Sequence, residues 1–254
     1  MTHISYSELK NWDFCPFYHK LVYIDKLEAF RGNEYTAFGS AVHEVCEKKL
    51  LKEDLDFKDV FIDEFKSNLK VLHKDQVEFN LDRVKEMIPQ GIAILPEILP
   101  AVDEYFDSYE VVSTEEMLMV PIDDSEYDFK GYIDAVFKTP DGKYHIVDWK
   151  TCSWGWDARR RADRLTTYQL TLYKHYYCKK HNIDPSNVET HFALLKRTAK
   201  KNRVEIFRVT SGKKKTENAL KLLNMALYNI DKERYIKKRT SCAKCIFHKT
   251  KHCP

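Results

Sequence analysis

The feature that most constrains this chain is a pair of short apolar runs joined by a turn. The run Tyr132–Lys138 is followed by Thr139-Pro140-Asp141-Gly142, a tetrapeptide typical of turns, and then by the run Lys143–Lys150. This pattern predicts a β-hairpin. Side chains alternate along a strand, so Asp148 and Lys150 are expected to share one face of the second strand.

A second acid lies in the first strand of this predicted hairpin, in the sequence Gly131-Tyr132-Ile133-Asp134. We expect Asp134 to converge with Asp148 and Lys150 at one end of the hairpin. Two carboxylates can hold a hard divalent cation, and a neighbouring lysine can stabilise negative charge or orient water. The hairpin is therefore a candidate site for metal-dependent phosphodiester chemistry.

Length and composition limit the possible classes of protein. A chain of 254 residues can form one large domain with its own core. It contains no run of about 18 apolar residues, and its first residues lack the basic and apolar segments of a signal peptide. We expect no contact with a membrane and a cytoplasmic location, in a bacterium or a phage-infected cell.

The net charge of +3 is unevenly distributed along the chain. Basic residues form three clusters: Arg159, Arg160, Arg161 and Arg164; Lys196, Arg197, Lys200, Lys201 and Arg203; and Lys213, Lys214 and Lys215. Concentrated basic surface on a nearly neutral chain suits an enzyme that acts on nucleic acid. The alternative is that each cluster is simply a solvated face.

Periodicity and capping signals predict the order of elements. Helices are expected over residues 5–15, 17–23, 37–51, 57–65, 81–99 (bent or broken near Pro89 and Pro96), 164–180 and 216–237. Strands are expected over residues 105–121, the hairpin, 190–196 and 204–210, and residues 240–254 are expected to be loop. This order predicts an α/β fold with a central mixed β-sheet, an N-terminal helical region and a cysteine-bearing C-terminal tail.

Two further patterns flank the hairpin. Upstream, Gly39 is followed by His43 and Glu47, and the last two share a helical face because they are four residues apart. Downstream, Gln169 and Tyr173 have the same spacing on another predicted helix. Taken singly, each pattern is common on ordinary helices.

In this order, the four patterns resemble the RecB-like branch of the PD-(D/E)xK nuclease superfamily, whose motifs are GxxxHxxxE, GxxD, (D/E)xK and QxxxY. The resemblance implies a restriction-endonuclease-like core and a site that binds Mg²⁺ or Mn²⁺. It implies that His43, Asp134, Asp148 and the Trp149 carbonyl ligate the metal, that Lys150 is catalytic, and that Gln169 and Tyr173 support the site and contact DNA. The third motif here is Asp-Trp-Lys, where family members often have glutamate or another middle residue. One imidazole among the ligands makes Mn²⁺ a plausible activator.

Seven cysteines in such a chain do not suggest a disulfide framework. Cys46, Cys152 and Cys178 are isolated and are expected to be small core residues. The remaining four lie near the two ends of the chain: Cys15, Cys242, Cys245 and Cys253. Four thiolates would make a metal site that orders an otherwise polar tail.

The resemblance extends to these terminal cysteines. It implies a [4Fe–4S] cluster of the kind bound by AddB-type and CRISPR-associated RecB-like exonucleases, with one cysteine before the nuclease motifs and three after. Zn²⁺ is the alternative, since His248 or His252 could replace a thiolate. A tail without any metal is the third possibility.

The basic clusters supply candidate DNA contacts. Arg159, Arg160, Arg164, Lys196 and Arg197 are predicted to meet backbone phosphates. Trp154 and Trp156 either stack on an unpaired base or pack in the protein interior.

These observations predict a divalent-metal-dependent DNA nuclease, an exonuclease on single strands or DNA ends, in recombination, repair or phage DNA metabolism. The chain carries no P-loop motif, so a helicase or recombination protein is a possible partner. A structure-specific endonuclease and a non-catalytic DNA-binding subunit are the alternatives. Residues 1–254 are expected to form one nuclease domain, with a helical part (1–100) that carries Cys15 and His43, a core (101–237) and a metal-cluster tail (238–254).

Overall fold

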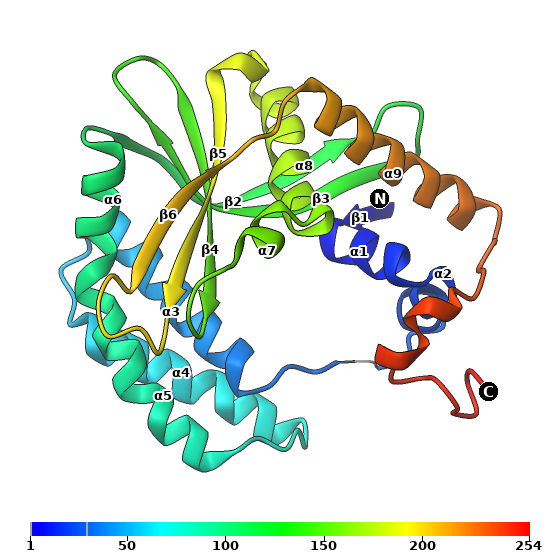
Figure 1. Ribbon diagram of the computed structural model, residues 1–254, viewed down its shortest axis with the longest axis horizontal. Helices are drawn as coiled ribbons and strands as arrows, with labels where there is room; N and C mark the ends of the chain where they lie inside the picture. The colour runs from blue at the N-terminus through cyan, green and yellow to red at the C-terminus, as the bar shows by residue number, and fades with distance from the viewer. Residues whose placement is uncertain (1, 29) are drawn as a thin grey trace.

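The computed structural model describes residues 2–28 and 30–254 and contains one mixed sheet between two layers of helices (Figure 1). The strands are β1 (Thr2–Ser5), β2 (Glu110–Pro121), β3 (Tyr127–Lys138), β4 (Tyr144–Cys152), β5 (Val188–Lys196) and β6 (Val204–Val209). Strands β1 and β4 pair with different parts of the same edge of β3, and β2 pairs with the opposite edge. Strands β5 and β6 follow β4 in that order. The β1–β3 and β4–β5 pairs are parallel, and the others are antiparallel.

Helices cover both faces of this sheet. The α-helices are α1 (Tyr6–Phe14), α2 (Pro16–His19), α3 (Glu34–Leu50), α4 (Phe57–Lys74), α5 (Leu81–Ile94), α6 (Ile98–Phe106), α7 (Ala158–Ala162), α8 (Arg164–His181) and α9 (Lys213–Asp231). A π-helical turn (Lys20–Ile24) and three 3₁₀ turns (Leu95–Glu97, Pro185–Asn187 and Arg239–Lys244) complete the elements. The predicted α/β fold with a central mixed sheet flanked by helices is confirmed. None of the helices in the described residues is long and apolar enough to cross a membrane.

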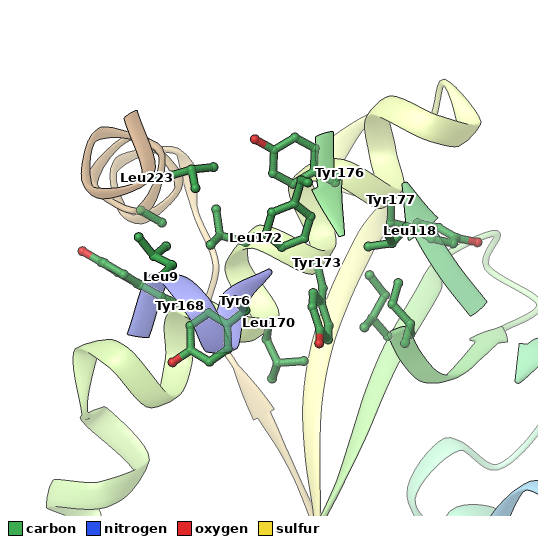
Figure 2. Packing of buried hydrophobic residues seen from close by; sticks show 14 of the residues in the cluster. Tyr6, Leu9, Leu118, Tyr168, Leu170, Leu172, Tyr173, Tyr176, Tyr177 and Leu223 are labelled. Atoms are coloured by element: carbon green, nitrogen blue, oxygen red, sulfur yellow. The ribbon is translucent and has the colours of Figure 1, made fainter. Parts of the chain in front are cut away.

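Two hydrophobic cores lie on the two faces of the sheet. Helices α1, α8 and α9 form the first core, in which the rings of Phe129 on β3 and Tyr176 on α8 stack at 4.3 Å. Figure 2 shows Tyr6 and Leu9 of α1 in the same core as Leu223 of α9 and the tyrosines of α8. Helices α3 to α6 form the second core. The candidate site residues come from strands β3 and β4 and from one helix of each layer, α3 and α8.

The predicted hairpin is present, and its turn has the expected form. The N–H of Gly142 donates to the carbonyl of Thr139 at 2.9 Å, and Gly142 adopts a φ of 82° that favours glycine. Strand β3 begins at Tyr127, before the predicted start, because it also pairs with β1 and β2.

Three expected boundaries lie far from the observed ones. The strand predicted from Tyr105 begins only at Glu110, because Ile98, Val102 and Phe106 recur at helical spacing and are buried together on α6. The helix expected over 57–65 continues to Lys74. The last helix ends at Asp231 and not at residue 237, where Glu233 turns the chain with a φ of 51°.

Packing between α4 and α5 gives a stability test. A Cβ atom at Gly91 would lie 2.1–2.8 Å from three ring atoms of Phe61. We expect Gly91→Ala to lower the free energy of unfolding by about 1–3 kcal/mol, because this clash outweighs a gain of about 1 kcal/mol in helix propensity. Urea unfolding of both proteins measures the difference.

Gly212→Ala is the matched control, since a Cβ atom there meets nothing within 4 Å. Because Gly212 is the N-cap of α9, where glycine is preferred over alanine, the stability of this variant should fall by less than about 1 kcal/mol. Equal stability of Gly91→Ala and the wild type would contradict this account of the packing.

Candidate active site

The candidate site lies in a gap along one edge of β3. Strand β2 occupies the other edge, so β1 and β4 share this one. Pairing with β1 ends at Lys130, and pairing with β4 begins at Ala135. Residues 131–134, the Gly-Tyr-Ile-Asp sequence, therefore lie between two partner strands.

A cleft opens at this gap. It has a volume of about 380 Å³ and is formed by β1, the first turn of α1, β3, the end of β4 and one face of α8. Its lining residues are His3, Ser5, Tyr6, Ser7, Lys130, Gly131, Tyr132, Asp134, Asp148, Lys150, Gln169 and Tyr173. The structure thus brings together three of the predicted motifs, with the fourth contributed by α3.

The side chain of Asp134 occupies the place where the β3–β4 ladder stops. Its Oδ2 accepts a hydrogen bond of 2.6 Å from the backbone N–H of Trp149 and lies 3.7 Å from Nδ1 of His43. Burial raises the pKa of Asp134 to about 6, against the opposing effects of Lys150 and the Trp149 N–H. Burial and the ammonium of Lys150 lower the pKa of His43 to about 4, so its imidazole is neutral and can ligate a metal.

Asp148 is held from two sides. Its Oδ1 accepts a hydrogen bond of 2.9 Å from Nε2 of Gln169, and its Oδ2 lies 2.6 Å from Nζ of Lys150 without the alignment of a hydrogen bond. Burial raises the pKa of Asp148 to about 6 although Lys150 opposes the shift. Burial would lower the pKa of Lys150, but the carboxylates of Asp148 and Asp134 outweigh it and raise that pKa. Lys150 is therefore a cation at neutral pH.

The glycines of the predicted motifs have packing roles. A Cβ atom at Gly131 would lie 2.7 Å from Cε1 of Tyr173, so the tyrosine ring of α8 requires a glycine in β3. Nε2 of Gln169 also donates to the hydroxyl of Tyr173 at 3.2 Å. A Cβ atom at Gly39 would lie 3.4 Å from Oγ1 of Thr151, which keeps α3 close to β4.

One acid near the site was not predicted from the sequence. Glu115 on β2 brings its carboxylate near Asp134 and His43, and the ligand atoms of these three residues lie within 4.8 Å of one another. Burial, the carboxylate of Asp134 and then that of Glu47 raise the pKa of Glu115 to about 7. No motif signals this residue, because its proximity depends on the pairing of β2 with β3. Asp148 does not belong to this compact group.

A second group of possible ligands, His145, Glu189 and His191, lies at the opposite end of β4 and β5. Nδ1 of His145 lies 3.1 Å from Nε2 of His191, and Tyr105 and Thr139 occupy the remaining ring nitrogens. Lys143 and Arg208 pair with Glu189. The partners of these groups are therefore already supplied by the protein.

The four terminal cysteines meet at one small cavity between α2 and the C-terminal tail. Cys15, Cys242, Cys245 and Cys253 line it together with His248 and aromatic side chains. The tail is tied to α1 by Ser241, whose hydroxyl donates to the Phe14 carbonyl. In Figure 1 the tail lies beside the N-terminal helices. Cys46 and Cys178 are buried in the cores, and Cys152 is half-buried.

The predicted DNA-contact residues fall into two sets. Arg159 and Arg160 are exposed on α7, whereas the exposed Arg164 pairs with Asp13 at 3.0 Å. Lys196 pairs with Glu205 at 3.4 Å, and Arg197 donates to the side chains of Gln90 and Ser153. These last two side chains have partners within the protein.

The two tryptophans that follow the β3–β4 hairpin differ in exposure. Trp156 is buried against Phe192 and Phe207, which makes it a packing residue. Trp154 is 69% exposed.

Comparison with known proteins gives a family. A model described as the PD-(D/E)XK nuclease superfamily matches residues 3–250 of this chain. A crystal structure of a "putative exonuclease" from Eubacterium rectale superposes with a TM-score of 0.55 at 18% identity, over 91% of this chain and 79% of that one. This likeness concerns the fold alone.

A crystal structure of SSO0001 has a TM-score of 0.38 and 15% identity over 91% of both chains, too little similarity to support an argument. The search of curated proteins found no match.

The raised pKa of Asp148 predicts a pH-dependent stability. The pKa of the Asp148 carboxyl is about 6 in the folded protein, above its ordinary 3.8. The folded protein therefore loses stability as the pH rises through this interval, because the unfolded chain releases the proton more readily.

In EDTA, Asp148→Asn removes this ionisation but also leaves the buried Lys150 without its partner, which lowers stability at both pH values. We therefore expect the stability of Asp148→Asn relative to the wild type to rise between pH 4 and pH 8, by on the order of 3 kcal/mol at most. Thermal unfolding of both proteins at pH 4 and pH 8 measures this change.

Asp141→Asn is the control of opposite sign, since hydrogen bonds from Thr139 and Lys143 lower the pKa of the exposed Asp141. That variant should be less stable than the wild type at pH 8. If the stability of Asp148→Asn relative to the wild type does not rise between pH 4 and pH 8, ionisation of the buried Asp148 does not cost stability.

Proposed function

This chain belongs to the PD-(D/E)XK nuclease superfamily, and we propose that it is a divalent-metal-dependent deoxyribonuclease, an exonuclease on single-stranded DNA or DNA ends. The observation that carries the proposal is the assembly of His43, Asp134, Asp148 and Lys150 around the gap in the sheet. The description of the E. rectale structure supports the choice of an exonuclease.

The donor set fits Mg²⁺ or Mn²⁺. The buried carboxylate of Asp148, the partly buried carboxylate of Asp134 and a neutral imidazole are hard or intermediate ligands, and the Oδ2 of Asp148 lacks an aligned hydrogen bond. We propose that His43, Asp134, Asp148 and the Trp149 carbonyl hold this ion. When bound, the ion would polarise the phosphate and lower the pKa of a water molecule.

The protein groups then have distinct tasks. Lys150 places a charged Nζ at the cleft and can neutralise a phosphoryl oxygen as negative charge develops there. Gln169 orients Asp148 through Oδ1, and the Trp149 N–H orients Asp134 through Oδ2. Tyr173 supports Gln169. The exposed Arg159 and Arg160 are proposed to contact phosphates, with the exposed Arg164 beside them.

We also propose that Cys15, Cys242, Cys245 and Cys253 hold a [4Fe–4S] cluster. Their shared cavity supports it, as does the N–H of Lys238, which donates to Sγ of Cys15 at 3.3 Å. Zn²⁺ is the alternative, because His248 lines the same cavity and could replace a thiolate.

The proposed domain organisation is a single nuclease domain. Pairing of β1 with β3 and contact between the tail and α1 connect the two ends of the chain to the core. A partner helicase or recombination protein, and a role in recombination, repair or phage DNA metabolism, stay predictions.

The nuclease proposal is tested with end-labelled DNA. We expect the wild type with Mn²⁺ or Mg²⁺ to degrade linear single strands and to spare circular ones. Asp148→Ala should lose activity by several orders of magnitude, because it removes a metal ligand and leaves Lys150 without its partner. Cleavage of the circle would favour a structure-specific endonuclease. If DNA stays intact in every reaction, the nuclease proposal fails and the alternative of a non-catalytic DNA-binding subunit is favoured.

The cluster proposal has its own readout. We expect anaerobically purified protein to be brown, with about four iron atoms per chain, and to bleach on addition of an iron chelator. Cys242→Ser should lose iron and unfold at a lower temperature, since cluster binding also stabilises the tail. Cys152→Ser, outside the cavity, is the control. Colourless protein with stoichiometric zinc would refute the cluster.

A further inference from the structure

We propose that Glu115, which lies outside the four motifs, is a ligand of the divalent metal ion together with His43 and Asp134. The inference rests on the proposed metal-dependent function and adds a residue to its site. The ligand atoms of these three residues already lie within 4.8 Å of one another. They come from three elements: α3, β2 and β3.

Strand register places Glu115 directly opposite Asp134. Thr114 pairs with Ala135, and Glu116 pairs with Ile133, so the residues between them face each other across β2 and β3. This proximity is built into the sheet and does not depend on a flexible loop. The carboxylate of Glu115 thus approaches Asp134 at the gap where β3 lacks a partner on its other edge.

The backbone at Glu115 has an unusual conformation for a strand. Its φ is 45°, in the left-handed region, and among the described residues no other position inside a strand has a positive φ. The hydroxyl of Thr114 donates to Glu47 of α3 at 3.2 Å, and the next side chain, Glu115, reaches His43 of the same helix. Consecutive residues of a regular strand would point to opposite faces. The strained conformation lets both approach α3, as strained residues at functional sites often do.

The negative charge of Glu115 is not balanced by a basic side chain of the described residues. Its neighbour Glu116 pairs with Lys180 and His181, at 2.7 and 2.5 Å. Within the described residues, Glu115 forms no such ion pair, although the carboxylate of Asp134 lies beside it. A divalent ion would neutralise the two acids at once.

Glu115 would be a fifth ligand, beside His43, Asp134, Asp148 and the Trp149 carbonyl. Gln169 and Lys150 hold the carboxylate of Asp148, which is outside the compact group. Glu115 would supply a second carboxylate on the side of His43. An imidazole with two carboxylates favours Mn²⁺ over Mg²⁺, because Mn²⁺ accepts nitrogen ligands more readily.

Mn²⁺ binding to the full chain tests the proposal without measuring activity. Isothermal titration calorimetry and electron paramagnetic resonance would compare the wild type with Glu115→Gln and Glu115→Gly. We expect both variants to weaken Mn²⁺ binding by about tenfold or more, as loss of groups that hold a metal commonly does. The resonance spectrum of bound Mn²⁺ should change as well.

Two further variants serve as references. Glu110→Gln makes the same change on the same strand, four pairs from Asp134, and should bind Mn²⁺ like the wild type. Glu115→Gly removes the side chain and accepts the positive φ, so its melting temperature in EDTA should not fall. A loss of Mn²⁺ affinity in this folded variant therefore reports on the carboxylate.

The outcomes separate this inference from the proposed function. If Glu115→Gln and Glu115→Gly bind Mn²⁺ as tightly as the wild type while Asp134→Asn does not, Glu115 is no ligand and the inference is overturned. If the wild type itself binds no Mn²⁺, the proposed metal-dependent function fails. A tenfold loss in both Glu115 variants, with Glu110→Gln unchanged, supports the inference.

Discussion

The site depends on one interruption in the pairing of β3. Its edge is shared by β1, which pairs up to Lys130, and β4, which pairs from Ala135. At the interruption, the carboxylate of Asp134 accepts the Trp149 N–H in place of a backbone carbonyl. This hydrogen bond satisfies the buried donor and lets the strands diverge, so that a cleft can open inside the sheet.

Packing around this interruption fixes the other groups. Helix α8 lays Tyr173 against Gly131, which places Gln169 within hydrogen-bonding distance of Asp148. Helix α3 approaches β4 at Gly39 and brings His43 to Asp134. Burying two acids beside one lysine costs stability, since the pKa of both acids rises to about 6. Such a cost is common at functional sites, where charged groups are held close together to bind a ligand or a cation.

The hairpin, its turn and the amphipathic helices could be predicted because their signals are local. Gly142 and the alternation around Asp148 belong to single segments, and the order of the four motifs indicated which segments converge. The positions of β1 and Glu115 could not be predicted in this way. Strand β1 has only four residues, and the side chain of Glu115 reaches the site through the β2–β3 register and a φ of 45°. The same holds for the partners of Lys196 and Arg197, whose DNA contacts stay a prediction: Glu205, Gln90 and Ser153 lie against these two side chains. Such partners come from distant parts of the chain and leave no local pattern.

Anomalous diffraction from crystals soaked in Mn²⁺ tests the central claim most directly, that the interruption in β3 is a divalent-metal site. The account predicts a manganese peak at residues 131–134, within coordination distance of the His43 imidazole and the Asp134 carboxylate, with the Trp149 N–H still bound to Asp134. A map without a peak there, or with manganese only between His145 and His191, would contradict it.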